Sequence, residues 1–364
     1  MKLSKILNAI EKTAPLVLQE SYDNSGLLVG LRDAEIKGAL LSLDCTEAVV
    51  EEAIRTGCDL VISHHPVIFK GLRNLTDSTP EQRTIRLAIK KNIALYACHT
   101  NLDNVIHGVN GKIASKLGLE DLHVLRPLSG ILTKLVTFCP LKHADTVRKA
   151  LFDAGAGSIG NYDQCSFNLE GFGTFRGNSN TAPFVGEKNK QHREKESRIE
   201  TVFPSFLRQQ VLNALFGAHP YQEVAYDLYS MDNPWQQAGA GLVGTLKGNW
   251  TETAFLALLK VVFGLKSFRH TALLGKKIKK VAVCGGSGSF LIPDALKAGA
   301  NIFLSADVKY HDFFQADGKM IVADIGHFES EQFTPEIFYE VLKRNFPKFA
   351  VRFSKVKTNP INYF

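Results

Sequence analysis

Hydrophobic residues in the first 127 positions follow two different spacings. Continuous apolar runs of about four to eight residues predict buried β-strands, and they occur in IKGALLSLDCT, CDLVISHH and IALYACHTNLD. Apolar residues three or four positions apart predict amphipathic helices in MKLSKILNAIEK, EAVVEEAIRTG and TPEQRTIRLAIKKN, and the glycine that ends the second is typical of a helix C-cap. Buried strands that alternate with helices indicate an α/β layered sheet covered on both faces.

The end of the chain repeats this pattern. KKVAVCGGSGSF, ANIFLSAD and KMIVADIGHFESE predict strands, whereas LIPDALKAG and PEIFYEVLKRNF predict helices. We therefore expect residues 1–127 and 233–364 to form one α/β domain.

Residues 128–232 have a different pattern. A predicted strand, helix and strand occur twice: ILTKLVTFCP, HADTVRKALFDAGAG and CSFNLEGFGTFRG, then RIETVFP, SFLRQQVLNALFGAHP and EVAYDLYSM. This βαββαβ order predicts a ferredoxin-like α+β domain inserted into the outer one. Clustered charge in GEKNKQHREKESR, residues 186–198, predicts a solvated loop within the insert.

Composition narrows the class of protein. The 43 basic residues are scattered among 36 acidic ones, so the net charge of +7 is weak evidence for a nucleic-acid partner. The six cysteines show no CxxC spacing, which argues against a disulfide framework or a thiolate zinc site. No stretch approaches the ~20 apolar residues that span a membrane. These features predict a globular cytoplasmic protein without a membrane partner.

Polar side chains gather at the predicted ends of four strands. They are Asp44 in SLDCT, His64 and His65 in SHHP, His99 and Asp103 in CHTNLD, and His327, Glu329 and Glu331 in GHFESE. Strand ends of a doubly wound sheet can converge on one edge despite wide separation in sequence. Imidazoles and carboxylates are the ligands of zinc, iron and manganese, so this convergence predicts a metal site.

The adjacent histidines favour two ions over one. Consecutive side chains on an extended backbone point to opposite sides, and Pro66 disfavours the α conformation for His65. A carboxylate such as Glu331 can bridge two ions ~3.5 to 4 Å apart. Any one of these histidines alone is more often a hydrogen-bonded structural residue; the combination favours the metal site.

Two further segments leave alternatives open. CGGSGSF has Leu291 where the last glycine of G-x-G-x-x-G belongs, and it lacks the ending of a P-loop. Its tight turn, Gly286 to Gly288, is either structural or a cradle for an anion near the metals. SADVKYHDF offers Asp307, Lys309 and His311 to support metal ligands or to transfer protons.

The motifs YDNSGLLVG, ISHHPVIFKG, HTNLD, GAHPYQEVAYD, GGSGS, SADVKYHD and GHFESE together resemble the Nif-three-like family, whose bacterial members are commonly called GTP cyclohydrolase 1 type 2 homologues. The resemblance implies a two-lobed α/β core, an insert similar to the PII and CutA folds, and a toroidal homohexamer built as a trimer of dimers. It implies two divalent ions per chain, zinc or iron with manganese as a further candidate. The implied ligands are His64, His65, Asp103, His327 and Glu331, with His99 joining one ion in some members.

The implied activity is metal-dependent hydrolysis, either of the GTP imidazole ring or of a related nucleotide or small molecule. His99 and His311 are candidate catalytic residues that could shuttle protons. The alternative is a non-enzymatic metal-binding scaffold or regulator whose PII-like insert senses a ligand. Nucleic-acid binding rests on the net charge alone and ranks last.

Overall fold

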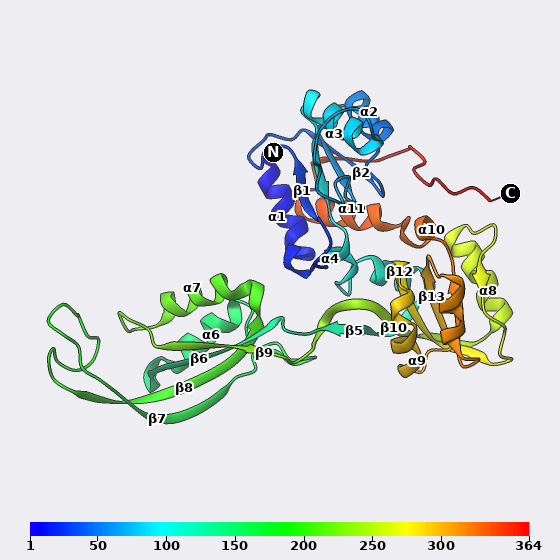
Figure 1. Ribbon diagram of the computed structural model, residues 1–364. Coiled ribbons are helices and arrows are strands. Elements are labelled where there is room, and N and C mark those ends of the chain that lie inside the picture. Colours follow the sequence, from blue (N-terminus) through cyan, green and yellow to red (C-terminus); the bar gives the residue numbers. More distant parts are fainter. Residues whose placement is uncertain (364) are drawn as a thin grey trace. The chain divides into compact units, whose positions relative to one another are not determined.

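The computed structural model describes residues 1–363 and divides the chain into two compact units (Figure 1). Met1–Arg126 and the chain from Gln237 onward form the first unit, and Pro127–Gln236 form the second. The first unit contains two sheets, and both have helices on their two faces, so the predicted layered α/β class is confirmed.

A five-stranded sheet is built mainly from the first part of the chain. Its order is β1-β4-β3-β2-β15, with bounds Gly26–Val29, Ala94–Ala97, Leu60–Ser63, Gly38–Ser42 and Ala350–Phe353. The last four of these strands are parallel, and β1 is antiparallel to β4. β2, β3 and β4 are buried along their whole length, which explains their continuous apolar sequences.

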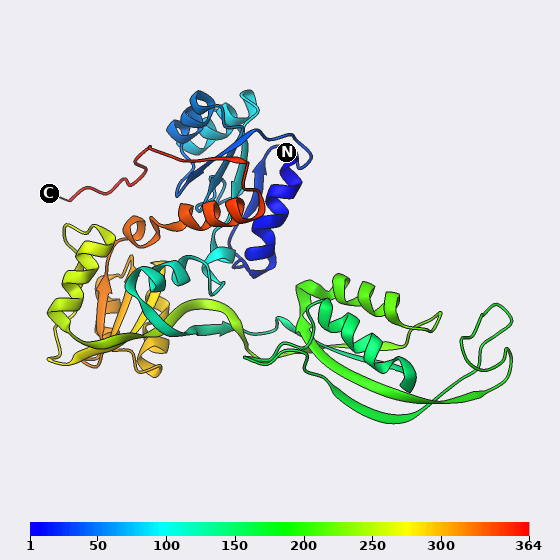
Figure 2. The same cartoon turned by 180° about the vertical axis from the view of Figure 1, so that it is seen from behind.

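Alternate residues of these strands face different helices. Leu40, Val61 and Leu95 pack against α2 and α3 (Glu47–Thr56 and Pro80–Lys90), while Ile62 and Tyr96 belong to the core shared with α1 and α11 (Leu3–Thr13 and Thr334–Asn345) (Figure 2). The predicted apolar stripe of α1 is buried, and α2 ends at a left-handed glycine, φ 72°, as its sequence predicts.

A six-stranded sheet is built mainly from the last part of the chain. Its order is β11-β14-β13-β12-β10-β5, with bounds Arg269–His270, Ile321–Asp324, Ile302–Ala306, Lys277–Ser287, Trp235–Thr251 and Leu119–Leu128. β12, β13 and β14 are parallel. One face packs against α9 (Ile292–Lys297), and the other packs against α5 (Val109–Leu117) and α8 (Glu252–Phe263). The second face shares one continuous hydrophobic core with the five-stranded sheet.

The second unit has the predicted βαββαβ order. Its elements are β6 (Leu132–Pro140), α6 (Ala144–Asp153), β7 (Phe167–Phe175), β8 (His192–Pro204), α7 (Arg208–Ala218) and β9 (Tyr226–Met231). The sheet order is β7-β8-β6-β9 with antiparallel neighbours. Apolar residues of α6 and α7 form one core with the covered face of this sheet.

The prediction of a loop over residues 186–198 is wrong for its second half. Residues from His192 onward belong to β8 and pair with β7, for example Glu194 with Gly173. Strand pairing uses backbone groups only, so charged residues at successive positions do not prevent it.

Candidate metal centre

The two adjacent histidines follow β3 directly, where the backbone leaves the sheet. The N–H groups of His64 and His65 both donate to the carbonyl of Leu43, each at 3.0 Å. The backbone therefore turns here, and the expected projection of the two rings to opposite sides is wrong. Their centroids lie 5.0 Å apart, and both rings enter one cluster.

The other candidate ligands come from two short helices and a strand end. His99 follows β4, and Asp103 is the last residue of α4 (Thr100–Asp103). His327 and Glu331 are the first and last residues of α10 (His327–Glu331), one turn apart after β14. The candidate ligands therefore meet where strands of both sheets of the first unit end. Asp103, His327 and Glu331 lie on helices, although strand ends were expected.

Glu331 lies at the middle of the cluster, and its side chain is only 3% exposed. Its Oε2 is 3.0 Å from Nε2 of His65 and 3.1 Å from Nε2 of His327, whereas its Oε1 is 3.7 Å from Nε2 of His64. Asp103 Oδ1 lies 3.6 Å from the same His64 nitrogen. The two oxygens of Glu331 thus face different histidines, as a carboxylate shared by two ions would.

Three sets of side chains have ligand atoms close enough to hold an ion. They are His64 with Asp103 and Glu331, His65 with His327 and Glu331, and His64 with His65 and His99. Within each set the atoms lie within 4.8 Å of one another. Imidazole and carboxylate donors in such sets suit zinc, iron or manganese.

All four histidines are oriented through their Nδ1 atoms. The acceptors are the Cys98 carbonyl for His64 at 2.9 Å, Asp44 for His65 at 2.7 Å, Asp23 for His99 at 2.8 Å and Asp307 for His327 at 2.6 Å. Since each acceptor has only lone pairs, each Nδ1 carries the proton and donates it. The neutral tautomer then presents the lone pair of Nε2 to the cluster, which is the arrangement that metal-binding histidines require.

The cluster contains buried polar atoms without a hydrogen bond of acceptable geometry: His64 Nε2, Asp103 Oδ1 and Glu331 Oε2. Such burial is costly unless a proton or a metal ion lies between the imidazole nitrogens and the carboxylate oxygens. The donor set therefore fits a metal ion.

The pKa shifts of the carboxylates and imidazoles in the cluster also indicate that it favours positive charge. Burial would raise the pKa of Glu331, but the imidazoles of His64, His327 and His65 outweigh it and hold that pKa well below its usual range. Burial and the neighbouring Glu331 carboxylate raise the pKa of Asp103. Burial would lower the pKa of His65, yet hydrogen bonds with Asp44 and Glu331 raise it to about 10. Burial would also lower the pKa of His327, but Glu331 and Asp307 raise it to about 9.

A glycine turn makes room for the central carboxylate. A Cβ atom at Gly286, where φ is +61°, would lie 2.3 Å from Glu331 Oε1. The amides of Gly285 and Gly286 donate to Asn110 Oδ1 and Ser330 Oγ. The turn therefore has a structural role, because it leaves room for Glu331. The amides of Gly285 and Gly286 already donate to acceptors within the protein.

The whole chain also matches a known family. The model of Duf34/NIF3 (NGG1p interacting factor 3) matches residues 1–360. This chain belongs to the Duf34/NIF3 family. It is 38% identical to the GTP cyclohydrolase 1 type 2 homolog of Halalkalibacterium halodurans over 98% of both chains. It is 36% identical to the Bacillus subtilis protein of the same name, over 99% of this chain and 98% of that one.

A solved structure supports the same assignment. The crystal structure of a Bacillus cereus protein related to NIF3 is 36% identical and superposes with a TM-score of 0.85, covering 100% of this chain and 99% of that one. The resemblance to the Nif-three-like family is thereby confirmed.

The two candidate catalytic histidines lie in different surroundings in this Duf34/NIF3 chain. The ring of His99 lies 5.1 Å from that of His64 and 5.4 Å from that of His65, inside the cluster. His311 is exposed on the 3-10 turn Tyr310–Ala316, where its ring contacts Tyr310 and Phe314. His311 belongs to none of the three sets of candidate ligands.

Sequence reasoning missed Asp23, which lies in the motif YDNSGLLVG. Its side chain is fully buried and accepts hydrogen bonds from His99, Ser25 and Thr100. Burial would raise the pKa of Asp23, but the bonds from His99 and Thr100 hold it well below its usual range. Asp23 and His99 are 76 residues apart, so no local sequence pattern indicates their contact.

A cavity of about 650 Å³ adjoins the cluster and is lined by His65, His327 and the chain segment 359–363. Carboxylates line it as well, from Asp44, Asp307, Asp324 and Glu329. The guanidinium of Arg269 also lines it and pairs with Asp324. In residues 1–363, no helix has the length and apolar character that crossing a membrane requires.

Proposed function

We propose that this chain is a metal-dependent hydrolase with two divalent ions bound in the cluster. His64, Asp103 and Glu331 would hold one ion, and His65, His327 and Glu331 would hold the other. The observation that carries the proposal is the set of Nε2 atoms that face carboxylate oxygens, because this arrangement needs a proton or a metal ion between each nitrogen and oxygen and its donor atoms are those that metals prefer. The names of the curated relatives are consistent with a hydrolytic activity.

When bound, two such ions supply an activated water near neutral pH and polarise the group that it attacks. Residues of the chain would transfer the proton that this water releases. Asp23 holds His99 with its Nε2 toward the cluster, so His99 takes a proton from water and returns it to the leaving group. We do not assign this step to His311, because its side chain is exposed and it belongs to none of the ligand sets.

The cavity beside the cluster limits the size of the substrate. Its volume of about 650 Å³ suits a small molecule up to roughly the size of a nucleotide. We therefore propose a nucleotide such as GTP or another small cyclic amide or ester as the substrate. Cytoplasmic location and assembly into a ring of six chains remain parts of the proposal that rest on the family.

The test combines metal analysis with a substrate screen. We expect about two ions per chain in purified protein, and turnover of at least one compound in a panel that contains GTP, nucleosides, cyclic amides and esters. Glu331→Gln should lose both metal and turnover, whereas His99→Gln should keep the metal and lose turnover. His123→Ala, which changes an exposed histidine of β5, is the matched control.

Two results would contradict the proposal. Turnover that survives complete removal of the ions would exclude metal-dependent chemistry. Full metal loading without hydrolysis across the panel would instead support the scaffold alternative.

A further inference from the structure

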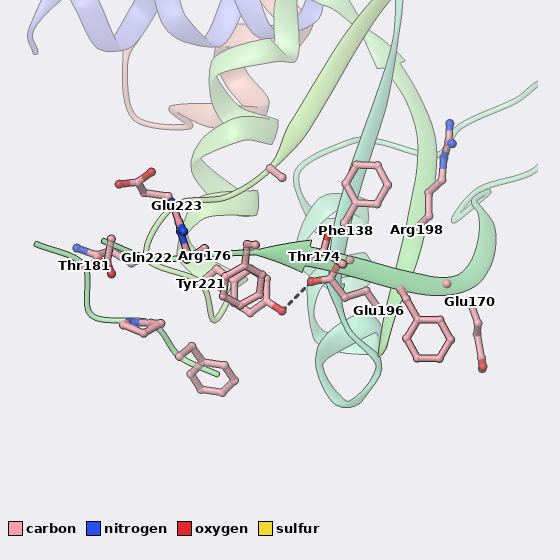
Figure 3. A pocket seen from close by; sticks show the side chains of 18 of the residues that line it. Phe138, Glu170, Thr174, Arg176, Thr181, Glu196, Arg198, Tyr221, Gln222 and Glu223 are labelled. Carbon is pink, nitrogen blue, oxygen red and sulfur yellow. Dashed lines mark hydrogen bonds between the residues drawn. The ribbon is translucent and has the colours of Figure 1, made fainter. Parts of the chain in front are cut away.

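The second unit contains a cavity of about 720 Å³ that is independent of the metal cluster. All of its lining residues belong to the segment 138–225. Figure 3 shows Phe138 and Tyr221 beside it, and Phe175 and Phe184 pack with Tyr221 at ring separations of 5.9 and 6.4 Å. A cavity of this size with aromatic walls suits a planar molecule of roughly nucleoside size.

A buried carboxylate faces this cavity. Glu196 is only 8% exposed, and the hydroxyl of Tyr221 donates to its Oε1 at 2.7 Å (Figure 3). Among residues 1–363, no Lys, Arg or His nitrogen forms an ion pair with Glu196, although the neighbouring Glu200 pairs with both Lys134 and Arg198. The other oxygen, Oε2, accepts no hydrogen bond from any group in residues 1–363, so it is free to accept one from a ligand in the cavity.

The neighbouring strand β7 has a glycine where the Glu196 carboxylate lies. A Cβ atom at Gly173 of β7 would lie 2.0 Å from Glu196 Oε2. Glycine within a strand weakens pairing and often marks a close approach of other groups, which here is the Glu196 side chain. The Glu196 carboxylate can therefore occupy its position only because residue 173 has no side chain.

The loop that carries Tyr221 is fixed by a buried histidine. His219 Nε2 donates to the carbonyl of Phe138 at 2.9 Å, and its Nδ1 accepts from the backbone N–H of Tyr221 at 3.0 Å. Burial lowers the pKa of His219, which keeps this neutral form. The aromatic wall and the hydroxyl on Glu196 are thus in place before any ligand arrives, which reduces the ordering cost of binding.

We propose that this cavity binds a small planar heteroaromatic molecule whose ring lies among Phe138, Phe175 and Tyr221 and whose edge donates N–H groups to Glu196. The site is separate from the proposed hydrolase centre and does not depend on it. A carboxylate with an unused oxygen selects ligands that present N–H donors and rejects rings of the same shape that lack them.

The test uses the full chain and two matched nucleosides in calorimetric titrations. Guanosine presents adjacent N–H donors on its ring edge, whereas purine riboside has the same fused rings without a donor there. We expect guanosine to bind at least about tenfold more tightly than purine riboside. Glu196→Gln should weaken guanosine binding by about tenfold or more and leave purine riboside nearly unchanged.

Gly173→Ala provides a second variant in case Glu196→Gln unfolds, since a methyl group there displaces the carboxylate without changing charge. Glu187→Gln is the control, because Glu187 is exposed, pairs with Lys190 and does not line the cavity. Thermal unfolding and metal content should match the unmodified protein in all three variants.

The proposal is overturned if guanosine does not bind at millimolar concentration, as would happen if another copy of the chain covered the cavity. It is equally overturned if purine riboside binds as tightly as guanosine, or if Glu196→Gln and Gly173→Ala both bind guanosine like the unmodified protein. None of these outcomes bears on the metal centre.

Discussion

Replacement of Gly286 by alanine tests whether the position of Glu331 controls metal binding. The new Cβ would lie 2.3 Å from Glu331 Oε1, and real Cβ atoms essentially never approach a heavy atom within 3.0 Å. The carboxylate would therefore have to move by roughly 0.7 Å, which exceeds the ~0.5 Å tolerance of a preorganised site. Because both proposed ions share this carboxylate, we expect both to bind more weakly, by about tenfold or more.

The substitution also places alanine at φ +61°, a left-handed conformation that costs about 1 kcal/mol for a residue with a Cβ. Gly264→Ala measures this backbone cost alone. Gly264, the C-cap of α8, has φ +66°, and no heavy atom of residues 1–363 outside its own turn lies within 4 Å of where a Cβ would stand. Without metal, Gly286→Ala should lose at least as much free energy of unfolding as Gly264→Ala, because it also displaces the buried Glu331 carboxylate.

Competition titrations against a chelator, followed by elemental analysis, compare metal affinity in the two variants. Gly264→Ala should bind metal like the unmodified protein, whereas Gly286→Ala should not. Equal metal affinity of the two variants would refute the reasoning, because it would mean that Glu331 can retreat without loss of a ligand.

Two further predictions concern the groups around the imidazoles. Asp44→Asn removes the charge that orients His65 and should weaken metal binding by about 10- to 100-fold, measured by the same chelator competition; unchanged affinity would mean that Asp44 has no part in positioning the ring. In the metal-free chain the pKa values of His65 and His327 are raised to about 10 and about 9, so at pH 7.5 both imidazoles hold an extra proton that metal must displace. Calorimetry in buffers of different ionisation enthalpy should therefore show about two protons released per chain, and affinity should rise with pH up to about 10; a pH-independent affinity would exclude this competition.

Local patterns predicted the secondary-structure elements well, for identifiable reasons. β2, β3 and β4 are buried on both faces, so their apolar sequences leave little ambiguity. The doubled histidine after β3 is conspicuous because polar residues rarely follow such a strand in pairs. The same argument from polar strand ends named Asp103 and Glu331, and the family motifs imply them as ligands as well.

Longer-range features were not predictable from local patterns. Asp23 and His99 are 76 residues apart, and their partnership depends on how β1 and β4 pair. The turn after Ser63 brings both histidine rings to one side, which a strand-based argument could not foresee. The charged part of β8 has the composition of a loop, but backbone pairing with β7 decides its structure.

The wide separation of the ligands in sequence has a consequence for synthesis of the protein. His65 and His327 are 262 positions apart, and the whole of the second unit is translated between them. A nascent chain that has emerged only as far as the second unit holds His64, His65 and His99 but lacks the central carboxylate and the fourth imidazole. If the proposed ions bind, their tight capture must wait until translation is almost complete, and a loaded centre would then indicate that both ends of the chain have been synthesised and that the first unit has folded.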